Sequence, residues 1–403
     1  MTIVIIGAGI AGVYAAETMR QSGFSGRIIL FDRDTNIPYD RPPLTKEFMV
    51  GNLSALDMHL REAAHFEKLS IELRLGTEIV SVNTEKRVVV EVNGELTPYD
   101  KLLLTTGSQL KKLPVKGASL QGVFYLKTLT DAEKMQKYIQ DVEHVAIIGA
   151  GFIGAELASS FRSLGKEVTI IERSSLPLEH VFGKELGKYF LHLHQTQGVK
   201  VVTEDEVVHF KGESQVEEVL TAKGKQISCQ AVIIGIGVEP NTSLARLDVN
   251  HDRGYVVDEW GQTSVPTIYA AGDCTMWPYK NQMIHIEHWD HAMNHGKCVA
   301  NNMLSNNRKP YSAVPYFWSD QYKSQFQYFG HASKEMKTLI RGRMKEHQFT
   351  YFFLNAQNNI EAALLINQQK NALLVRRLIN QEKIIQPDLL KNESIPIKET
   401  VLK

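Results

Sequence analysis

Residues 145–173, VAIIGAGFIGAELASSFRSLGKEVTIIER, decide the fold of this chain. The run begins as an apolar strand, turns at a cluster of glycines, continues with helical periodicity and ends as a second strand at Glu172. Gly149, Gly151 and Gly154 fit the G-x-G-x-x-G pattern, whose glycines allow a tight turn, close approach of a pyrophosphate and tight packing of helix on sheet. Glu172, 18 residues after the last glycine, is placed to bind the hydroxyls of an adenosine ribose. The stretch therefore predicts a strand–helix–strand unit that binds a dinucleotide.

The same pattern occurs a second time at residues 3–32, IVIIGAGIAGVYAAETMRQSGFSGRIILFD. Gly7, Gly9 and Gly12 take the three glycine positions, and Asp32 follows 20 residues after the last of them. One such pattern alone is weak support for a dinucleotide site, but each copy here has its strands, helix and terminal acid. The phosphates are expected at the helix N-terminus, where unpaired N–H groups and the helix dipole favour negative charge. The duplication predicts two dinucleotide sites of similar design in one chain.

Composition is that of a globular protein with two or three domains in its 403 residues. The 45 basic and 45 acidic side chains cancel, so net charge gives no support for binding nucleic acid. The first strand begins at Thr2 and no apolar run is long enough to span a bilayer, so we expect neither a signal peptide nor a membrane anchor. Cys229, Cys274 and Cys298 are widely spaced and lack a C-x-x-C motif, which argues against disulfides and a zinc knuckle and favours a cytoplasmic protein.

A proline-rich loop and several strands are expected between the two fingerprints. The loop NIPYDRPPLTKEFM (36–49) contains tandem prolines, which fix φ and predict a rigid, shaped segment. A helical stretch around 59–69 and strand-like, alternating runs at 71–82 and 87–92 follow. YDKLLLTTGSQ (99–109) reads as a buried strand, after which the polar segment KKLPVKG (111–117) is typical of a crossover between domains.

The second half of the chain continues this alternation of strands and helices. Helices are expected near 130–141 and 183–197, and the second unit ends in the Gly- and Pro-rich transition GIGVEPNTSL (235–244). Residues 254–275 return to strand patterning and end at Gly272-Asp273, directly before the helix-like stretch WDHAMNHGKCVANNML.

From about Tyr311 the sequence predicts a separate small α+β domain. Strand-like aromatic or apolar runs precede a helix near 370–380; these runs are YFWSDQY, FQYFG, FTYFFLN and EAALLIN. The last residues, QPDLLKNESIPIKETVLK, are compatible with either a docked or a frayed segment.

The motifs together resemble those of the FAD-dependent, pyridine-nucleotide-linked ferredoxin reductases of oxygenase systems, a family that includes putidaredoxin reductase, rubredoxin reductase and the reductases of aromatic-ring dioxygenases. The match runs to about residue 330, and YDRPPLTK and FWSDQY are far more specific than the glycine motifs. The matching stretches, in the family's order, are VIIGAGIAG, YDRPPLTKEF, TTGS, AIIGAGFIGAELA, TIYAAGDCT, EHWDHAMNHG and YFWSDQY.

This resemblance implies an α/β fold of the glutathione-reductase type, with two Rossmann-like dinucleotide-binding domains and a small α+β C-terminal domain. The FAD-binding domain would be discontinuous, over residues 1–112 and 241–311. The NAD-binding domain would take residues 113–240, and residues 312–403 would cap the flavin. The implied activity is transfer of hydride from NADH to FAD, followed by transfer of single electrons to a [2Fe–2S] ferredoxin that serves a Rieske dioxygenase or a cytochrome P450.

The resemblance also assigns residues to the FAD site. Gly7, Gly9, Gly12 and Asp32 would bind the pyrophosphate and ribose of FAD. Asp273 would reach the ribityl chain; capping of a helix is an alternative role that is compatible with this one.

Two charged residues of the proline-rich loop are implied to contact the flavin, although solvated surface charges are the simpler interpretation. These are Arg41 and Lys46. Lys46 is expected to pair with Glu156, two residues after Gly154, beside the flavin N5, where a positive charge stabilises negative charge on reduced flavin. The alternative for Glu156 is compensation of its own helix dipole.

Trp289 and Trp318 are expected near the isoalloxazine by family position, with ordinary core tryptophans as the alternative. Gly235 joins Gly149, Gly151, Gly154 and Glu172 in the NADH site. The four histidines of the segment HIEHWDHAMNH have a spacing that a helical metal site would permit, but no acidic ligand pattern accompanies them, and no metal is expected; they are His285, His288, His291 and His295.

A carboxylate at Glu172 accepts hydrogen bonds from a 2′-hydroxyl and repels a 2′-phosphate, so NADH is expected over NADPH. Arg173 weakens this preference for NADH, because its side chain would attract a 2′-phosphate if the Glu172 side chain turned away.

Other proteins of this architecture pass their electrons elsewhere. Disulfide reductases need a thiol pair beside the flavin, and related thiol enzymes need one cysteine in the loop after the first unit, but residues 36–49 contain no cysteine. A rubredoxin reductase and an NADH oxidase remain as enzymatic alternatives. An alternative from a different class is an apoptosis-inducing-factor-like protein, which uses NADH-dependent association as a signal.

Overall fold

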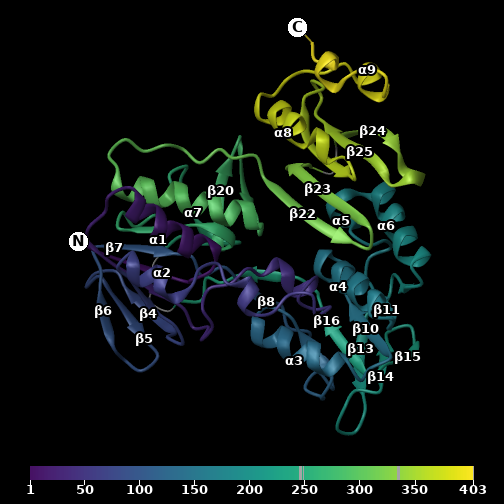
Figure 1. Ribbon diagram of the computed structural model, residues 1–403, viewed down its shortest axis with the longest axis horizontal. Coiled ribbons are helices and arrows are strands. Elements are labelled where there is room, and N and C mark those ends of the chain that lie inside the picture. Colours follow the sequence, from purple (N-terminus) through teal and green to yellow (C-terminus); the bar gives the residue numbers. More distant parts are fainter. Residues whose placement is uncertain (245–246, 248, 334–335, 403) are drawn as a thin grey trace. The chain divides into compact units, whose positions relative to one another are not determined.

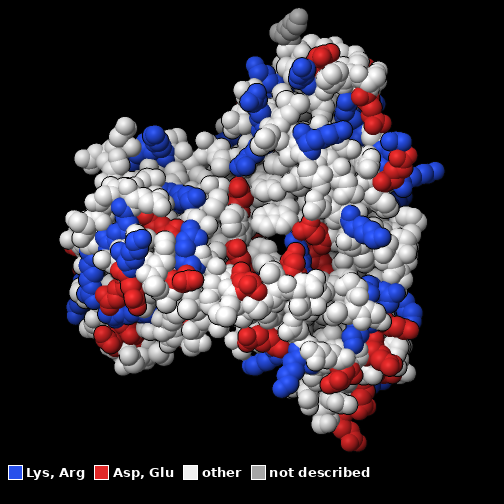
Figure 2. Space-filling model, in the orientation of Figure 1, with Lys and Arg blue, Asp and Glu red and all other residues white. Residues whose placement is uncertain are grey.

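The computed structural model describes residues 1–244, 247, 249–333 and 336–402, and these residues form two compact units (Figure 1). Unit 1 contains Met1–Asp40, Ala55–Gln109 and Val238–Pro315; unit 2 contains Arg41–Ser54, Leu110–Gly237 and Tyr316–Lys403. Within the described part of the chain, no helix combines the length and the apolar character needed to cross a membrane. On the face shown in Figure 2, acidic and basic side chains are interspersed, as expected from their equal numbers.

Unit 1 is built on a five-stranded parallel sheet in the order β19-β7-β1-β2-β3, which is the sheet expected of a Rossmann-like domain. Its strands are β1 (Thr2–Ile6), β2 (Arg27–Phe31), β3 (Ile71–Arg74), β7 (Lys101–Leu104) and β19 (Ile268–Ala270). Helix α1 (Ile10–Gln21) packs on α7 (Trp289–Leu304). The two helices meet at backbone contact, because a Cβ on Gly296 would lie 2.4 Å from the Ala11 carbonyl oxygen.

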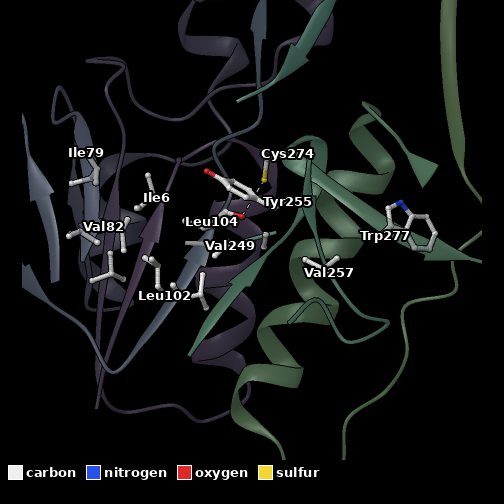
Figure 3. Close-up of a cluster of buried hydrophobic side chains, with 14 of the residues drawn as sticks. Ile6, Ile79, Val82, Leu102, Leu104, Val249, Tyr255, Val257, Cys274 and Trp277 are labelled. Atoms are coloured by element: carbon white, nitrogen blue, oxygen red, sulfur yellow. Dashed lines mark hydrogen bonds between the residues drawn. The ribbon is translucent and has the colours of Figure 1, made fainter. Parts of the chain in front are cut away.

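Unit 1 also contains two small three-stranded sheets and a short helix. One sheet is antiparallel and contains β4 (Ile79–Asn83), β5 (Val88–Glu91) and β6 (Leu96–Pro98); the other contains β18 (Tyr255–Val256), β20 (Thr275–Tyr279) and β21 (Gln282–His285); the helix is α2 (Ala63–Lys68). Side chains of the three sheets meet in one buried apolar cluster, in which Leu102 and Leu104 lie among Val82, Tyr255 and Trp277 (Figure 3).

The strand-like run at 71–82 forms two strands that belong to different sheets. Gly76, with φ of +65°, lies between β3 and β4 and interrupts the extended backbone. Asp273 was expected directly before a helix. Instead, β20 and β21 lie between Asp273 and α7, and the N-cap of α7 is His288. Asp273 therefore does not cap that helix.

Unit 2 contains a second five-stranded parallel sheet, in the order β12-β11-β10-β16-β9. Its strands are β9 (Val123–Tyr125), β10 (His144–Ile148), β11 (Glu167–Ile171), β12 (Lys200–Val202) and β16 (Ala231–Ile234). The helices of this part are α3 (Leu129–Ile139), α4 (Phe152–Ser163), α5 (Glu179–Phe182) and α6 (Lys184–Thr196). An antiparallel sheet of this unit contains β13 (Val207–Lys211), β14 (Glu218–Thr221) and β15 (Gln226–Ser228). The short strands β8 (Ser108–Leu110) and β17 (Val238–Pro240) pair with each other, and β17 belongs to unit 1.

The C-terminal segment of unit 2 is a five-stranded antiparallel sheet in the order β22-β23-β26-β25-β24. It contains β22 (Tyr316–Gln321), β23 (Ser324–Gly330), β24 (Lys337–Arg343), β25 (Gln348–Leu354) and β26 (Ile360–Ile366), followed by α8 (Ala372–Asn380) and α9 (Pro387–Lys391). Phe182 and Phe190, from the α5–α6 region, share one buried cluster with Phe326 and Phe349 of this sheet. The segments expected as an NAD-binding and a C-terminal domain therefore share a hydrophobic core, and their division into separate domains stays a prediction.

The C-terminal segment is docked rather than frayed over residues 387–401. Leu390 and Thr400 are fully buried, and residue 401 bridges to Ile385. The guanidinium of Arg341, on β24, donates to four backbone carbonyl oxygens of this segment, those of Leu390, Asn392, Glu393 and Ile395, at 2.7 to 3.3 Å. One side chain thus ties the terminal segment to the sheet.

We expect Arg341→Ala to expose this segment to proteolysis. Loss of the charged donor should lower the local stability by about 1.4 kcal/mol, so trypsin should cleave at Lys391 and Lys398 about tenfold faster. Mass spectrometry of the fragments measures the rate. Arg343→Ala is the control, because Arg343 pairs only with the exposed Glu346 among the interactions described for it. Equal cleavage rates for the two variants would contradict the assignment.

Candidate functional site

In the first glycine loop, between β1 and α1 in unit 1, backbone atoms leave no room for a side chain at two of the three glycines. Gly7 has a φ of +108°, and a Cβ on it would lie 2.2 Å from the Thr105 carbonyl oxygen. A Cβ on Gly12 would lie 2.0 Å from the Gly7 carbonyl oxygen. Around Gly9, in contrast, no atom beyond Gly9 itself and its two chain neighbours lies within 4 Å of the corresponding position. Two of the glycines are needed by the protein itself, and the third borders open space.

The second glycine loop, between β10 and α4 in unit 2, repeats this geometry. A Cβ on Gly149, whose φ is +100°, would lie 2.5 Å from the carbonyl oxygen of Gly235, and a Cβ on Gly154 would lie 2.2 Å from that of Gly149. No protein atom lies within 4 Å of a Cβ on Gly151. Gly235, a predicted cofactor residue, follows the end of β16, and its carbonyl oxygen leaves no room for a side chain at Gly149.

The two open glycines are also the N-caps of the helices that follow. Gly9 caps α1 and Gly151 caps α4, and in neither helix does a side chain cap the first turn or an acidic residue occupy it. The N–H groups of the first turn are therefore available to an anion, and the helix dipole favours one. An uncapped helix terminus beside open space fits the pyrophosphate of a dinucleotide in both loops.

The acidic residues predicted to bind ribose are held by their own loops. Asp32 accepts from the Ala8 N–H at 2.6 Å and from the Asp34 N–H at 2.9 Å. Glu172 accepts in the same way from Ala150 and Ser174, both at 2.7 Å. Each carboxylate has about four lone-pair sites, so two remain for ribose hydroxyls. These backbone bonds, which sequence reasoning missed, fix both carboxylates at the edge of their glycine loops.

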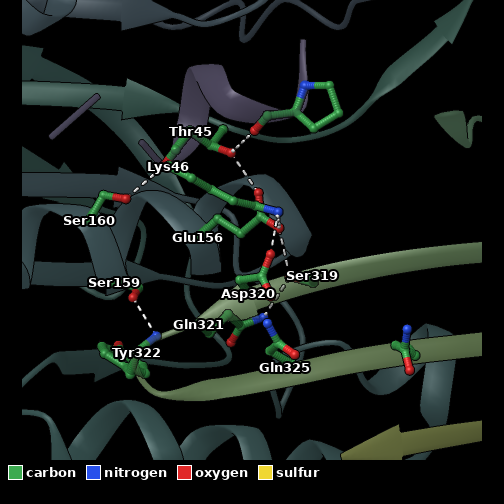
Figure 4. Close-up of polar contacts among 12 residues, drawn as sticks. Thr45, Lys46, Glu156, Ser159, Ser160, Ser319, Asp320, Gln321, Tyr322 and Gln325 are labelled. Atoms are coloured by element: carbon green, nitrogen blue, oxygen red, sulfur yellow. Dashed lines mark hydrogen bonds and ion pairs between the residues drawn. The ribbon is translucent and has the colours of Figure 1, made fainter. Parts of the chain in front are cut away.

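A buried polar cluster in unit 2 surrounds Glu156 on α4 (Figure 4). The ion pair expected with Lys46 is present, with Lys46 Nζ 3.5 Å from Glu156 Oε1. The hydroxyl of Thr45 donates to Glu156 Oε2 at 2.6 Å and that of Ser319 donates to Oε1 at 2.7 Å. Lys46 Nζ also donates to Asp320 Oδ2 at 2.9 Å. We refer to Thr45, Lys46, Glu156, Ser319 and Asp320 as the Glu156 cluster.

Polar residues of α4 also bind the backbone of the segments that supply the cluster. The Ser160 hydroxyl donates to the Thr45 carbonyl oxygen at 2.6 Å, and the Ser159 hydroxyl accepts from the Tyr322 N–H at 2.5 Å. Residues 41–49 of the proline-rich loop belong to unit 2, and this part is fixed further because Leu44, Phe48 and Met49 are buried. The shaped loop predicted from Pro42 and Pro43 thus has a definite docking surface on α4.

Burial governs the charges in the cluster. It raises the pKa of Glu156, against the opposing effects of Lys46 and of the Thr45 and Ser319 hydroxyls. Burial alone would lower the pKa of Lys46, but Glu156 and Asp320 outweigh it and raise the pKa. Lys46 therefore stays charged, whereas burial works against the charged form of Glu156.

The remaining predicted residues lie on both units. In unit 2, Arg41 is exposed, and Trp318 of β22 lies under the ammonium of Lys46, with Nζ 5.6 Å from the ring centroid. In unit 1, Trp289 Nε1 donates to Asp40 Oδ1 at 2.7 Å, and Asp273 lies in a short turn at Gly272–Cys274. The roles of these residues toward a flavin stay predictions.

Two of the clustered histidines are core residues. His291 and His295 are buried, and their rings pack with those of Trp277 and Tyr311. Burial lowers the pKa of His295 to about 3, so its Nδ1 is a neutral acceptor for the N–H of Gly272 at 3.3 Å. Among the residues that the structure describes, no group of three or more His, Cys, Asp or Glu side chains is arranged to hold a metal ion.

Comparison with known proteins matches nearly the whole chain. A family model described as pyridine nucleotide-disulphide oxidoreductase matches residues 1–296, and one described as reductase C-terminal matches residues 316–401. Rhodocoxin reductase of Rhodococcus erythropolis is 32% identical and covers 99% of this chain and 94% of its own length. The ferredoxin–NAD(+) reductase component of the p-cumate 2,3-dioxygenase system of Pseudomonas putida is 30% identical, over 98% of each protein.

The fold is also that of a solved reductase. A crystal structure of the covalent putidaredoxin reductase–putidaredoxin complex superposes with a TM-score of 0.95 at 30% sequence identity, and the match covers 99% of this chain and 97% of that chain. The predicted fold class, two Rossmann-like domains and a small α+β C-terminal domain, is thereby confirmed; the structure adds that the C-terminal sheet is antiparallel.

Proposed function

Because the chain belongs to the pyridine nucleotide-disulphide oxidoreductase family, we propose that it is a flavoprotein that takes hydride from NADH onto FAD and passes single electrons to a [2Fe–2S] ferredoxin. That ferredoxin would in turn serve a Rieske dioxygenase or a cytochrome P450. The observation that carries the proposal is the pair of matching glycine loops, each with an open cradle at Gly9 or Gly151 and a fixed carboxylate at Asp32 or Glu172.

The residues divide between the two cofactors. The loop of unit 1, with Asp32, holds FAD, and the loop of unit 2, with Glu172, holds NADH. A bound FAD supplies the capacity to accept a hydride and to release its electrons one at a time. Arg41, Lys46, Asp273, Trp289 and Trp318 are proposed to contact the flavin. The ammonium of Lys46 would favour negative charge on the reduced cofactor.

The state of the cysteines supports direct release of electrons rather than a thiol relay. All three cysteines are free, and burial raises the pKa of Cys274 to about 11, which keeps it a thiol. The proline-rich loop contains no cysteine. Three free thiols also support a cytoplasmic location, where thiols stay reduced.

The test is anaerobic reduction of the purified protein by NADH, followed by mixing with [2Fe–2S] ferredoxins and with a rubredoxin. Bleaching of the flavin and rapid reduction of a ferredoxin are the expected results. Preference for rubredoxin or for O₂ would identify the enzymatic alternatives. A long-lived complex of reduced flavin with NAD and slow transfer to every carrier would favour an apoptosis-inducing-factor-like signalling role.

We expect Glu172→Ala to narrow the difference in kcat/KM between NADH and NADPH. The carboxylate is tied to two backbone N–H groups, so in the wild type it does not turn away from a 2′-phosphate. Its removal would abolish the repulsion, and Arg173, the next residue in the chain, would then be the nearest charged residue in sequence. The gain for NADPH should be about tenfold, or about 1.4 kcal/mol. Steady-state kinetics with both nucleotides measures it, and an unchanged ratio would remove Glu172 from the site.

A further inference from the structure

The turn at Gly272–Cys274, which carries Asp273, lies against the first turn of α1 within unit 1. Gly272 has a φ of +78°, and a Cβ on it would lie 3.1 Å from the Cβ of Ala11. Ala11 comes two residues after Gly9, the N-cap that borders open space. The turn therefore borders the glycine loop that is proposed to hold FAD.

A buried histidine of α7 binds the backbone of this turn. The Gly272 N–H donates to Nδ1 of His295 at 3.3 Å, and His295 exposes only 1% of its surface. Its ring stacks on that of Tyr311, with the centroids 4.7 Å apart and the planes at 19°, which fixes the direction of Nδ1. The next residue, Gly296, allows α7 to reach backbone contact with α1. His295 thus lies where α1, α7 and the turn meet.

We propose that His295 is a positioning residue of the FAD site: its Nδ1 holds the Gly272 N–H, which keeps the turn in place and presents Asp273 to the cofactor. The proposal rests on the proposed function, because it takes FAD as the occupant of the glycine loop in unit 1. It goes beyond that function by giving a part in cofactor binding to a buried side chain that acts only through Asp273.

The other hydrogen bonds of the turn leave the Gly272 N–H to His295. The Ala271 N–H donates to the Leu104 carbonyl oxygen at 3.0 Å, and the Thr275 hydroxyl donates to the Gly272 carbonyl oxygen at 2.7 Å. Among the hydrogen bonds described for this segment, Nδ1 of His295 is the acceptor of the Gly272 N–H. A buried N–H that loses its acceptor is costly, and this one would reach water only if the turn moved away from α7.

The imidazole suits this task because it stays neutral. Burial lowers the pKa of His295 to about 3, so Nδ1 keeps its lone pair and Nε2 carries the proton. The ring of His291, with its centroid 4.9 Å away, is neutral as well, because burial lowers its pKa well below the ordinary value. Nδ1 of His295 therefore accepts the hydrogen bond at neutral pH.

The test compares the rate at which FAD leaves the purified yellow protein in the wild type, His295→Leu and His295→Asn. Ultrafiltration at intervals after dilution measures the free FAD. His295→Leu removes the acceptor and should release FAD about tenfold faster, the equivalent of about 1.4 kcal/mol. His295→Asn keeps an acceptor, because its Oδ1 is attached to Cγ as Nδ1 is in histidine, and its rate should stay within about threefold of that of the wild type.

His291→Leu is the matched control. His291 lies one turn earlier on α7 and is equally buried, but its Nδ1 contacts the Tyr311 hydroxyl at 3.3 Å instead of the turn. This variant should keep a release rate close to that of the wild type. Equal rates for the wild type and His295→Leu, or equal acceleration by His291→Leu, would overturn the inference. If His295→Leu does not fold, His295→Met, a flexible apolar replacement, takes its place.

Combination with Asp273→Ala separates positioning from a general loss of stability. Asp273→Ala alone should accelerate the release of FAD about tenfold. Added to His295→Leu, it should accelerate release by less than about threefold, because the carboxylate is then no longer held at the cofactor. Independent effects that multiply would show that His295 does not act through Asp273, and would overturn the inference. Failure of the wild type to retain FAD would instead contradict the proposed function.

Discussion

Gly151→Asp is expected to abolish reduction by NADH while FAD stays bound. The substitution costs the protein itself little, because Gly151 has an ordinary φ of −76° and no protein atom lies within 4 Å of a Cβ there. The new carboxylate would occupy the open side of the loop and repel a pyrophosphate. A charge pair about 5 Å apart at an effective dielectric constant of about 20 costs about 3 kcal/mol, so kcat/KM for NADH should fall at least about 100-fold.

Gly9→Asp, the equivalent change in unit 1, serves as the matched control. Gly9 has a φ of −71° and the same open surroundings. This variant should be purified without the yellow flavin, whereas Gly151→Asp should be yellow but not bleached by NADH. Circular dichroism and thermal melting of both apoproteins should match those of the wild-type apoprotein. If both variants retained FAD and full NADH activity, neither loop would be a dinucleotide site.

Lys46→Met is expected to lower the stability of the protein by about 3 kcal/mol near neutral pH, since removal of one partner from a buried ion pair leaves uncompensated charge. Lys46 is the cation in the ion pair described for Glu156, so the variant leaves Glu156 unpaired. Asp320, which also pairs with Lys46, then adds a second negative charge without its cation. Thermal melting of the variant and the wild type measures the loss.

The loss should depend on pH in a defined direction. Burial raises the folded-state pKa of Glu156 above the ordinary value of 4.5, and removal of Lys46 raises this pKa further. Between 4.5 and that raised pKa the folded state binds more protons than the unfolded state, so the variant's stability falls as pH rises. The difference from the wild type should therefore be smaller near pH 5 than near pH 8. Lys46→Met/Glu156→Gln should recover much of the loss, and a loss that is independent of pH and of Glu156 would contradict this account.

Local sequence patterns were sufficient to predict the two strand–helix–strand units and their glycine loops. The periodicities that define β1, α1, β10 and α4 lie within about 30 consecutive residues. The steric demand on Gly12 or Gly154 is equally local, because it comes from the carbonyl oxygen of Gly7 or Gly149. The helix at Trp289–Leu304 was predicted at its observed bounds for the same reason. The same patterns did not show that residues 71–82 form two strands, which Gly76 divides.

The ion pair of Lys46 and Glu156 was predicted from family resemblance, but its surroundings were not. Residues 45, 156 and 319 are separated by more than 100 positions, and no local pattern indicates that two hydroxyls bind one buried carboxylate. Ser319 and Asp320 had only one signal, their place in the FWSDQY motif on a strand that begins the C-terminal sheet.

The sequence by itself determined two dinucleotide-binding units, because the glycines, strands and terminal acid of each unit form a pattern within about 30 consecutive residues. Only the tertiary structure decided that the proline-rich loop and the C-terminal sheet converge on α4. It also decided that Lys46 lies between two carboxylates, since hydrogen bonds and burial among distant segments depend on how those segments pack.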